Sequence, residues 1–271
     1  MGKIWLIASG KGGVGKSTIA GSLAMALADM GSRVCVIDAD IGLRDQDAIL
    51  GLENSVVYDL MDVACRGCSL SQALISPPDR DRLSLLPSSQ FARSKDLPTK
   101  AYERILSQLK EDYDWVLIDG PAGIERGLRS LFSEQIDEVL LVCTPDDVCL
   151  RDAERVIQLL GKKEMPRPKL VVNRLDPTLI RIKEMMSASV IAQSLDVELF
   201  GEIPEDSMVY RALLKHIRLM DVDCSAAQAI TRIAKRMSGE TVPLFDVGSE
   251  SRSFFRRVFP KRLKEVKLVD R

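Results

Sequence analysis

The chain is predicted to fold as an α/β protein with a doubly wound, mostly parallel sheet. Short apolar runs recur along the sequence, and segments with apolar residues at helical spacing separate them. Strands that are apolar throughout are buried on both faces, which requires helices on both sides of the sheet. A glycine-rich stretch after the first run favours a version of this fold that binds a phosphate group.

The expected elements alternate along the chain. Apolar runs predict strands at residues 4–8, 34–37, 83–86, 115–118, 139–143, 170–172 and 199–203. Helical spacing of apolar residues predicts helices at 16–30, 100–111, 151–160, 187–195 and 225–237. Residues 76–82, rich in Pro, Asp and Arg, are expected to form a polar surface loop.

Composition limits the class of protein. With 271 residues, of which 46% are hydrophobic, the chain can bury a large core as one domain. No apolar run approaches the roughly 18 residues that span a bilayer. The N-terminus begins in a strand-like segment without the pattern of a cleavable leader. We therefore expect a cytoplasmic protein.

The six cysteines do not form a disulfide pattern. Cys35 and Cys143 lie inside expected strands, where a thiol behaves as a small core residue. Cys65 and Cys68 have the C-x-x-C spacing of half a metal site or of a redox pair. A second ligand pair is missing, and the single histidine, His216, lies far along the chain. Reduced, incidental thiols are therefore favoured, with metal or redox chemistry left open.

Charge is unevenly distributed along the chain. Residues 252–271 carry eight basic and two acidic side chains, a net charge of +6, which leaves −7 for residues 1–251 out of a total of −1. An acidic body with a basic end indicates an interaction segment. We expect one folded domain at 1–245, a flexible tether at 246–253 and a basic amphipathic tail at 254–271.

A phosphate-binding motif lies between the first expected strand and the first expected helix. The sequence fits G-x-x-x-x-G-K-[ST], in which backbone N–H groups and a helix N-terminus surround phosphate oxygens. Lys16 is expected to reach the β- and γ-phosphates, the Ser17 hydroxyl to hold Mg²⁺ and Thr18 to contact phosphate. ATP and Mg²⁺ are the expected cofactors of this P-loop NTPase type of sheet, and the binding loop consists of Gly10, Lys11, Gly12, Gly13, Val14, Gly15, Lys16, Ser17 and Thr18.

Three carboxylates follow expected strands. Asp38 and Asp40 come after the run at 34–37, and Asp119 comes after the run at 115–118. The carboxyl ends of strands in a doubly wound sheet face the ligand crevice. These side chains are therefore expected to organise the metal ion and the attacking water.

Lys11 departs from an ordinary phosphate loop. A second lysine in the same loop cannot easily serve the phosphates that Lys16 binds, but it can reach the nucleotide of a facing subunit. This predicts an ATP-dependent homodimer with nucleotide in its interface. Lys11, Lys16 and Asp40 are accordingly the expected catalytic residues.

Several stretches carry a family resemblance. The run from Lys11 to Ser17, together with Asp38, Asp40 and Asp119, resembles the deviant Walker A ATPases, which include ParA, MinD and the nitrogenase iron protein. Residues 39–44, 50–54, 57–60, 119–125, 172–174 and 201–206 most resemble the septum site-determining MinD group, and the similarity covers most of residues 3–240.

The resemblance implies roles for individual residues. Asp40 would position the attacking water, while Asp38 and Asp119 would support Mg²⁺. The division inhibitor MinC and the topological regulator MinE would bind near the helix that starts at Arg151 and Asp152. Adenine would be held by Asn173, Pro204, Glu205 and Asp206.

The tail resembles the short amphipathic helix that binds this group to membranes when ATP pairs two subunits. Its apolar residues share one side of a helical wheel and Lys and Arg the other, the composition of an interfacial helix. Pro260 divides the segment into two short pieces. We expect ATP-dependent peripheral binding to the anionic inner face of the cell membrane, through Phe254, Phe255, Val258 and Phe259.

Three alternative functions stay open. A ParA-like ATPase of chromosome or plasmid segregation would bind DNA, which the charge of −7 on residues 1–251 disfavours. An iron–sulfur carrier has only Cys65 and Cys68 in its support. A flagellar-number regulator is disfavoured by the sequence at 41–45. The leading hypothesis is an ATPase that helps to position the division septum by recruiting an inhibitor.

Overall fold

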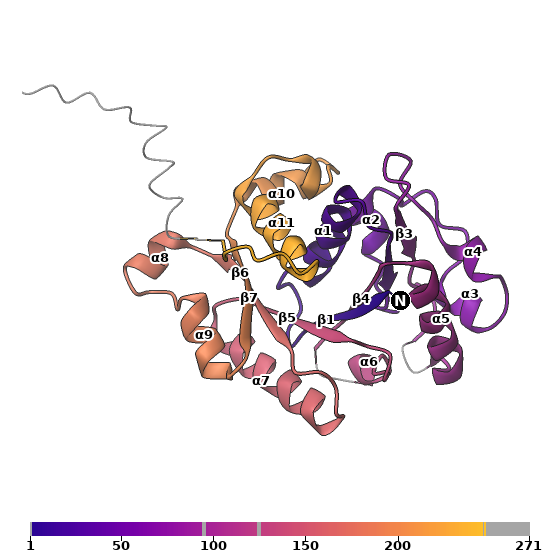
Figure 1. Cartoon of the computed structure of the whole chain (residues 1–271), viewed down its shortest axis with the longest axis horizontal. Helices are drawn as coiled ribbons and strands as arrows, with labels where there is room; N and C mark the ends of the chain where they lie inside the picture. The colour runs from indigo at the N-terminus through magenta and orange to yellow at the C-terminus, as the bar shows by residue number, and fades with distance from the viewer. Residues whose placement is uncertain (1, 94–95, 124–125, 246, 248–271) are drawn as a thin grey trace, which may run out of the picture.

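The computed structural model describes residues 2–93, 96–123, 126–245 and 247. In this part of the chain, seven strands pair in parallel in the order β3-β2-β4-β1-β5-β6-β7 (Figure 1). The doubly wound fold predicted from the sequence is confirmed. The strands are β1 (Lys3–Ser9), β2 (Val34–Asp38), β3 (Leu83–Leu86), β4 (Trp115–Ala122), β5 (Glu138–Cys143), β6 (Lys169–Leu175) and β7 (Glu198–Pro204).

Helices cover both faces of the sheet. Figure 1 shows α1 and α11 on one side and α7 and α9 on the other. α1 and α11 contact each other over the strands, and α11 packs on β7. All five helices predicted from helical spacing are present: α1 (Lys16–Asp29), α5 (Thr99–Asp112), α7 (Asp147–Lys162), α9 (Ala188–Leu195) and α11 (Ser225–Met237).

Other helices were not predicted, and most have five residues or fewer. One turn of helix offers no periodicity to detect, so local capping decides its position. In α3, for example, Asp59 and Asp62 form a capping box. No helix in the described ranges is both long and apolar enough to cross a membrane. The additional helices are α2 (Gln46–Leu50), α3 (Leu60–Ala64), α4 (Leu70–Ala73), α6 (Arg126–Arg129), α8 (Pro177–Arg181), α10 (Ser207–Leu214) and the 3-10 helix η2 (Leu219–Asp221).

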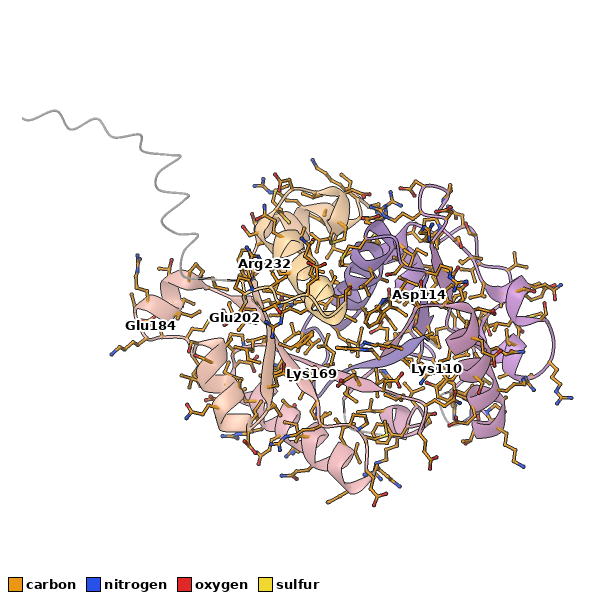
Figure 2. All side chains as sticks on the ribbon, viewed as in Figure 1. Lys110, Asp114, Lys169, Glu184, Glu202 and Arg232 are labelled. Carbon is orange, nitrogen blue, oxygen red and sulfur yellow. The ribbon has the colours of Figure 1, made fainter. Side chains whose placement is uncertain are left out.

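The amino ends of the strands are closed by aromatic rings and ion pairs. Trp5 contacts the Trp115 ring edge-on at a centroid distance of 6.2 Å and the Phe200 ring at 5.6 Å. Lys110 lies 2.9 Å from Asp137. Lys169 lies 3.5 Å from Glu138 and 3.1 Å from Glu198. Lys110 and Lys169 are labelled in Figure 2, and we call these three contacts the amino-end ion pairs.

The expected polar loop at 76–82 is a loop, and charged contacts attach it to distant segments. Arg80 pairs with Asp29 at the end of α1 (2.9 Å) and with Asp221 in η2 (2.7 Å). Arg218 donates one hydrogen bond to each carboxylate oxygen of Asp79, at 2.7 and 2.6 Å. These pairs fix the loop beside the amino end of β3.

Apart from Val247, the expected tether and the whole expected tail, including Phe254, Phe255, Val258 and Phe259, lie outside the described residues.

Candidate nucleotide site

The glycine-rich loop follows β1 and leads directly into α1. Gly13 and Gly15 have φ values of 77° and 91°, a left-handed conformation that side chains with a Cβ rarely adopt. At Gly10, a Cβ would lie 2.4 Å from the carbonyl carbon of Asp152, so the loop abuts the backbone of α7. Residues 11–18, together with Ser9, Asp40, Ala122 and Arg174, line a cavity of about 320 Å³, which we call the phosphate cavity.

Lys16 lines this cavity and contacts the buried carboxylate of Asp119. Its Nζ lies 2.6 Å from Asp119 Oδ1 and 3.2 Å from Ser17 Oγ. The Lys16 and Asp119 side chains are only 5% and 1% exposed. The Ser17 hydroxyl and the Asp119 carboxylate thus converge on one positive centre, and both are the hard oxygen donors that suit Mg²⁺. The residues present therefore fit a magnesium ion.

Asp38 lies behind the cavity and organises the chain around it. Its two oxygens accept backbone N–H groups from Asp40 (3.2 Å), Asp45 (3.1 Å) and Gln46 (3.1 Å). Burial, with the nearby negative charge of Asp119, raises the pKa of Asp38 to about 7. Both oxygens are thus occupied by the segment that leads into α2, a role that its strand-end position did not predict.

Asp40 lies at the cavity wall and is partly buried. Burial raises its pKa, Lys16 opposes that rise, and the charge of Asp119 adds to it. A carboxylate in this place can accept a hydrogen bond from a water molecule that approaches the phosphates. The geometry is compatible with the expected catalytic role, which stays a prediction.

Lys11 lies at the rim, about half exposed, with its Nζ 3.3 Å from Asp146 Oδ1. Asp146 also caps α7 by accepting the backbone N–H of Cys149 at 2.9 Å. Lys11 therefore contacts a residue of its own chain in this structure. The expected contact with the nucleotide of a second copy stays a prediction.

A second cavity of about 310 Å³ adjoins the first, and we call it the base cavity. Asn173, Pro204, Glu205 and Asp206, the four residues expected to hold adenine, all line it. Asn173 Nδ2 donates to the carbonyl oxygen of Val14 at 2.8 Å, which links β6 to the phosphate loop. Asp206 caps α10 by accepting the backbone N–H of Met208 at 2.8 Å.

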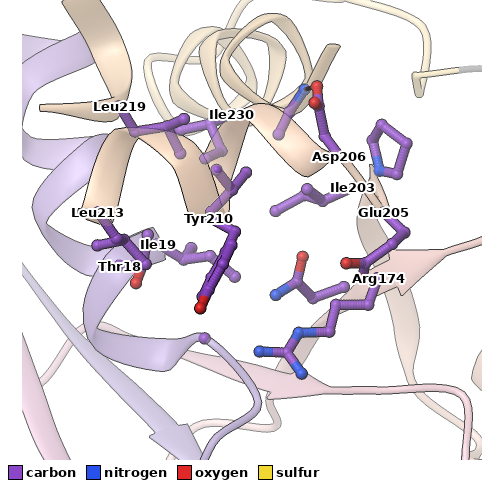
Figure 3. Close-up of a pocket in the computed structure, with 15 residues that line it drawn as sticks. Thr18, Ile19, Arg174, Ile203, Glu205, Asp206, Tyr210, Leu213, Leu219 and Ile230 are labelled. Carbon is purple, nitrogen blue, oxygen red and sulfur yellow. Dashed lines mark hydrogen bonds between the residues drawn. The ribbon is translucent and has the colours of Figure 1, made fainter. Parts of the chain in front are cut away.

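Arg174 and Tyr210 also line the base cavity, and sequence reasoning assigned neither to the site. Figure 3 shows the Tyr210 ring and the Arg174 side chain extending into it from α10 and β6. Arg174 has a φ of 60°, and Tyr210 is 67% exposed. Arg174 lines the phosphate cavity as well, so it lies between the two. A positive φ and an exposed ring give no sequence signal.

The expected partner residues lie in the first half of α7. Arg151 is exposed, whereas Asp152 is partly buried, pairs with Arg155 at 3.0 Å and abuts Gly10. The partner surface expected from the sequence is therefore in direct contact with the phosphate loop.

Cys65 is exposed and Cys68 partly buried. Within the described ranges, no three His, Cys, Asp or Glu residues form a group able to hold a metal.

Comparison with known proteins identifies the family. The family model described as "ParA: NUBPL iron-transfer P-loop NTPase" matches residues 1–238. The septum site-determining protein MinD of Helicobacter pylori is 40% identical over 256 residues, which cover 92% of this chain and 95% of that protein. That identity extends over nearly the whole of both chains.

Solved structures agree with this assignment. The MinC:MinD cell division protein complex of Aquifex aeolicus gives a TM-score of 0.83 at 36% identity, covering 89% of this chain and 98% of that one. MinD of Pyrococcus horikoshii, solved with Mg-ADP, gives 0.76 at 27% identity, covering 88% and 96%. The chain belongs to the MinD family of septum site-determining ATPases.

Proposed function

We propose that this chain dimerises when it binds ATP, and that the dimer then binds the membrane and recruits a division inhibitor. As a MinD-family ATPase it hydrolyses ATP with Mg²⁺ and acts in positioning the division septum. The observation that carries the proposal is the difference in exposure between the two lysines of the phosphate loop. Lys16 is buried against Asp119, while Lys11 is half exposed at the rim.

Nucleotide binding would begin with Lys16. A phosphate group in the cavity competes with Asp119 for its ammonium group, because both are anions within reach of the same side chain. Lys16 then binds phosphate, and the oxygens of Asp119 and Ser17 become available to a cation. Mg²⁺ held there would neutralise charge on the phosphates. Asp40 would orient the attacking water from the cavity wall.

Dimer formation would depend on Lys11. Its contact with Asp146 is an exposed ion pair, a class of interaction worth about 0–1 kcal/mol. Exchange of this weak partner for the phosphates of a facing copy would therefore cost little. A lysine that reaches across to the second nucleotide makes ATP part of the interface, so ATP stabilises the dimer.

Partner binding would use α7. The Aquifex aeolicus structure contains MinC together with MinD, and its MinD is 36% identical to this chain. This supports a MinC-like inhibitor as partner. Arg151 and Asp152 are the proposed contact residues, and the contact between Asp152 and Gly10 offers a direct path from nucleotide to partner surface. A MinE-like regulator is proposed for the same helix from the sequence resemblance.

Membrane binding would use residues 254–271. One tail of Phe and Val opposite Lys and Arg would bind an anionic surface weakly and reversibly. Two tails on one dimer raise the effective affinity without any new contact. ATP would thereby control how long the protein stays on the inner face of the membrane. DNA binding of the ParA-like kind is disfavoured by the acidic body and by the similarity to MinD proteins.

Co-sedimentation with anionic liposomes tests this proposal. We expect the full chain to pellet with ATP and not with ADP. A variant that ends at Gly248, a Phe255→Glu variant and a Lys11→Ala variant should all stay in the supernatant, while Lys11→Ala should still bind ATP. Sedimentation that persists after truncation would contradict the role of the tail. Absence of binding with any nucleotide would refute the membrane switch and make DNA the next ligand to test.

A further inference from the structure

Gln46 contacts all three residues that the sequence predicts to hold Mg²⁺, namely Asp38, Asp119 and Ser17. It is the first residue of α2 and is fully buried. Its backbone N–H donates to Asp38 Oδ2 at 3.1 Å. Its side-chain Nε2 donates to Asp119 Oδ2 at 2.7 Å and to the Ser17 carbonyl oxygen at 2.9 Å. Three separate hydrogen bonds thus join Gln46 to Asp38, Ser17 and Asp119.

The side-chain bonds require an amide. Both protons of Nε2 are used, and both acceptors are oxygens that carry full or partial negative charge. Turning the amide over would place Oε1 against the Asp119 carboxylate and the Ser17 carbonyl, so the orientation is determined by the neighbours. Glutamate of the same length cannot donate when ionised, and leucine leaves both acceptors without this partner.

The packing of α2 explains how Gln46 reaches the site. A Cβ on Gly21 of α1 would lie 2.8 Å from Gln46 Oε1 and 2.6 Å from Ile49 Cγ2, so α2 lies directly on the backbone of α1. Among the described residues, Oε1 has no hydrogen-bond partner. A buried acceptor without a partner opposes stability. The bonds to Asp119 and Ser17 are therefore the better explanation for a glutamine in this place.

We propose that Gln46 is a positioning residue that fixes Asp119 and Ser17 for the Mg²⁺–nucleotide state. Lys16 holds Oδ1 of Asp119 and Gln46 holds Oδ2. When Lys16 turns to phosphate, Gln46 keeps the carboxylate from rotating and leaves Oδ1 directed at the cation. The bond to the Ser17 carbonyl fixes the residue whose hydroxyl lies on the same side. This inference rests on the proposed placement of Mg²⁺ beside these residues.

Calorimetric titration with a non-hydrolysable ATP analogue, in EDTA and in Mg²⁺, tests the inference without relying on turnover. Mg²⁺ should strengthen binding to the wild type. For Gln46→Leu we expect affinity in EDTA within about twofold of the wild type, and a gain from Mg²⁺ that is about tenfold smaller, the effect of losing a hydrogen bond to a charged group. Gln46→Glu, which has the same length and cannot donate when it is ionised, should lose at least as much.

Two further variants make the outcome decisive. Ile49→Ala removes packing between α2 and Gly21 without touching the site, so its gain from Mg²⁺ should stay at the wild-type value. Asp119→Asn should lose the gain. If Asp119→Asn keeps it, the placement of Mg²⁺ is wrong and the inference fails with it. If only Asp119→Asn loses it, the placement stands and Gln46 has no positioning role. Equal losses in Ile49→Ala and Gln46→Leu would attribute the effect to docking of α2 and overturn the inference.

Discussion

An ammonium–carboxylate ion pair lies at each end of the sheet, and the two pairs differ in their exposure to solvent. At the amino ends, Lys169 is 22% exposed and lies 3.1 Å from the more exposed Glu198. At the carboxyl ends, Lys16 and Asp119 are almost completely buried and lie 2.6 Å apart. The two distances are similar, so solvent makes the difference. Water screens the first pair, whereas the second has lost hydration that only strong partners can replace.

The surroundings of each pair also differ in shape. At the amino ends, the Lys3 ammonium group lies 5.3 Å from the Trp115 ring and the Lys169 ammonium group lies 5.8 Å from the Phe200 ring, so aromatic surface fills the space beside the charges. At the carboxyl ends, two adjoining cavities leave room for a ligand. One end completes its own interactions, and the other presents buried charge to an open cavity.

Exchange of one lysine at each end gives the largest expected contrast. Lys16→Ala should weaken ATP binding at least about a hundredfold, since two or more charge-assisted hydrogen bonds to phosphate are lost. Lys169→Ala, the matched variant, should leave ATP affinity within about twofold and lower the free energy of unfolding by about 0–1 kcal/mol. Fluorescent-nucleotide titration and urea unfolding measure the two quantities. Wild-type ATP affinity in Lys16→Ala would remove this lysine from the phosphate site.

Exchange of one carboxylate at each end should have a smaller effect and should act on rate only. Asp40→Ala should bind ATP normally and hydrolyse it about a hundredfold more slowly, the usual contribution of a positioned acid–base group. Glu138→Ala removes a carboxylate from the amino-end ion pairs and should hydrolyse ATP at the wild-type rate. Single-turnover phosphate release separates hydrolysis from binding. A normal rate in Asp40→Ala would end its assignment as the residue that orients water.

The fold could be predicted from the sequence because its strands are buried on both faces. β2 and β3 are buried at every position, so their sequences are mostly apolar, with Ser84 the exception inside β3 and Asp38 at the end of β2. α2 has five residues and no such signal, although it supplies part of the site. Among the helices, those of five residues or fewer could not be predicted, because so short a segment shows no helical periodicity.

For the site, sequence spacing identified residues that act through local geometry. The glycine-rich loop is contiguous, so a pattern predicts it, and the structure brings its residues together with Asp40 around one cavity. Gln46 and Asp119 are 73 residues apart, and only the packing of α2 on α1 joins them. Asp38 was expected to support Mg²⁺, and its bonds to three backbone N–H groups show a structural role that its place in the sequence did not reveal.

Opposite pKa shifts predict opposite dependences of stability on pH. Burial raises the pKa of Asp38 to about 7, above the value of about 3.9 in an unfolded chain. Between these values the folded state holds a proton that the unfolded state has lost, so stability falls as pH rises through this window. Arg218 lowers the pKa of Asp79 to about 2. Its contribution is therefore present above about pH 4 and is lost as pH falls towards 2.

Urea unfolding of nucleotide-free protein at pH 4.5, 6 and 7.5 tests the first sign. Asp38→Asn loses hydrogen-bond acceptors at every pH, but it cannot gain the charge that burial opposes. Its stability relative to the wild type should therefore improve from pH 4.5 to 7.5. Asp79→Asn should be less stable than the wild type by at most about 1 kcal/mol across this range, because the Asp79 side chain is half exposed. A difference between Asp38→Asn and wild type that does not change with pH would show that the carboxyl end is hydrated like the amino end.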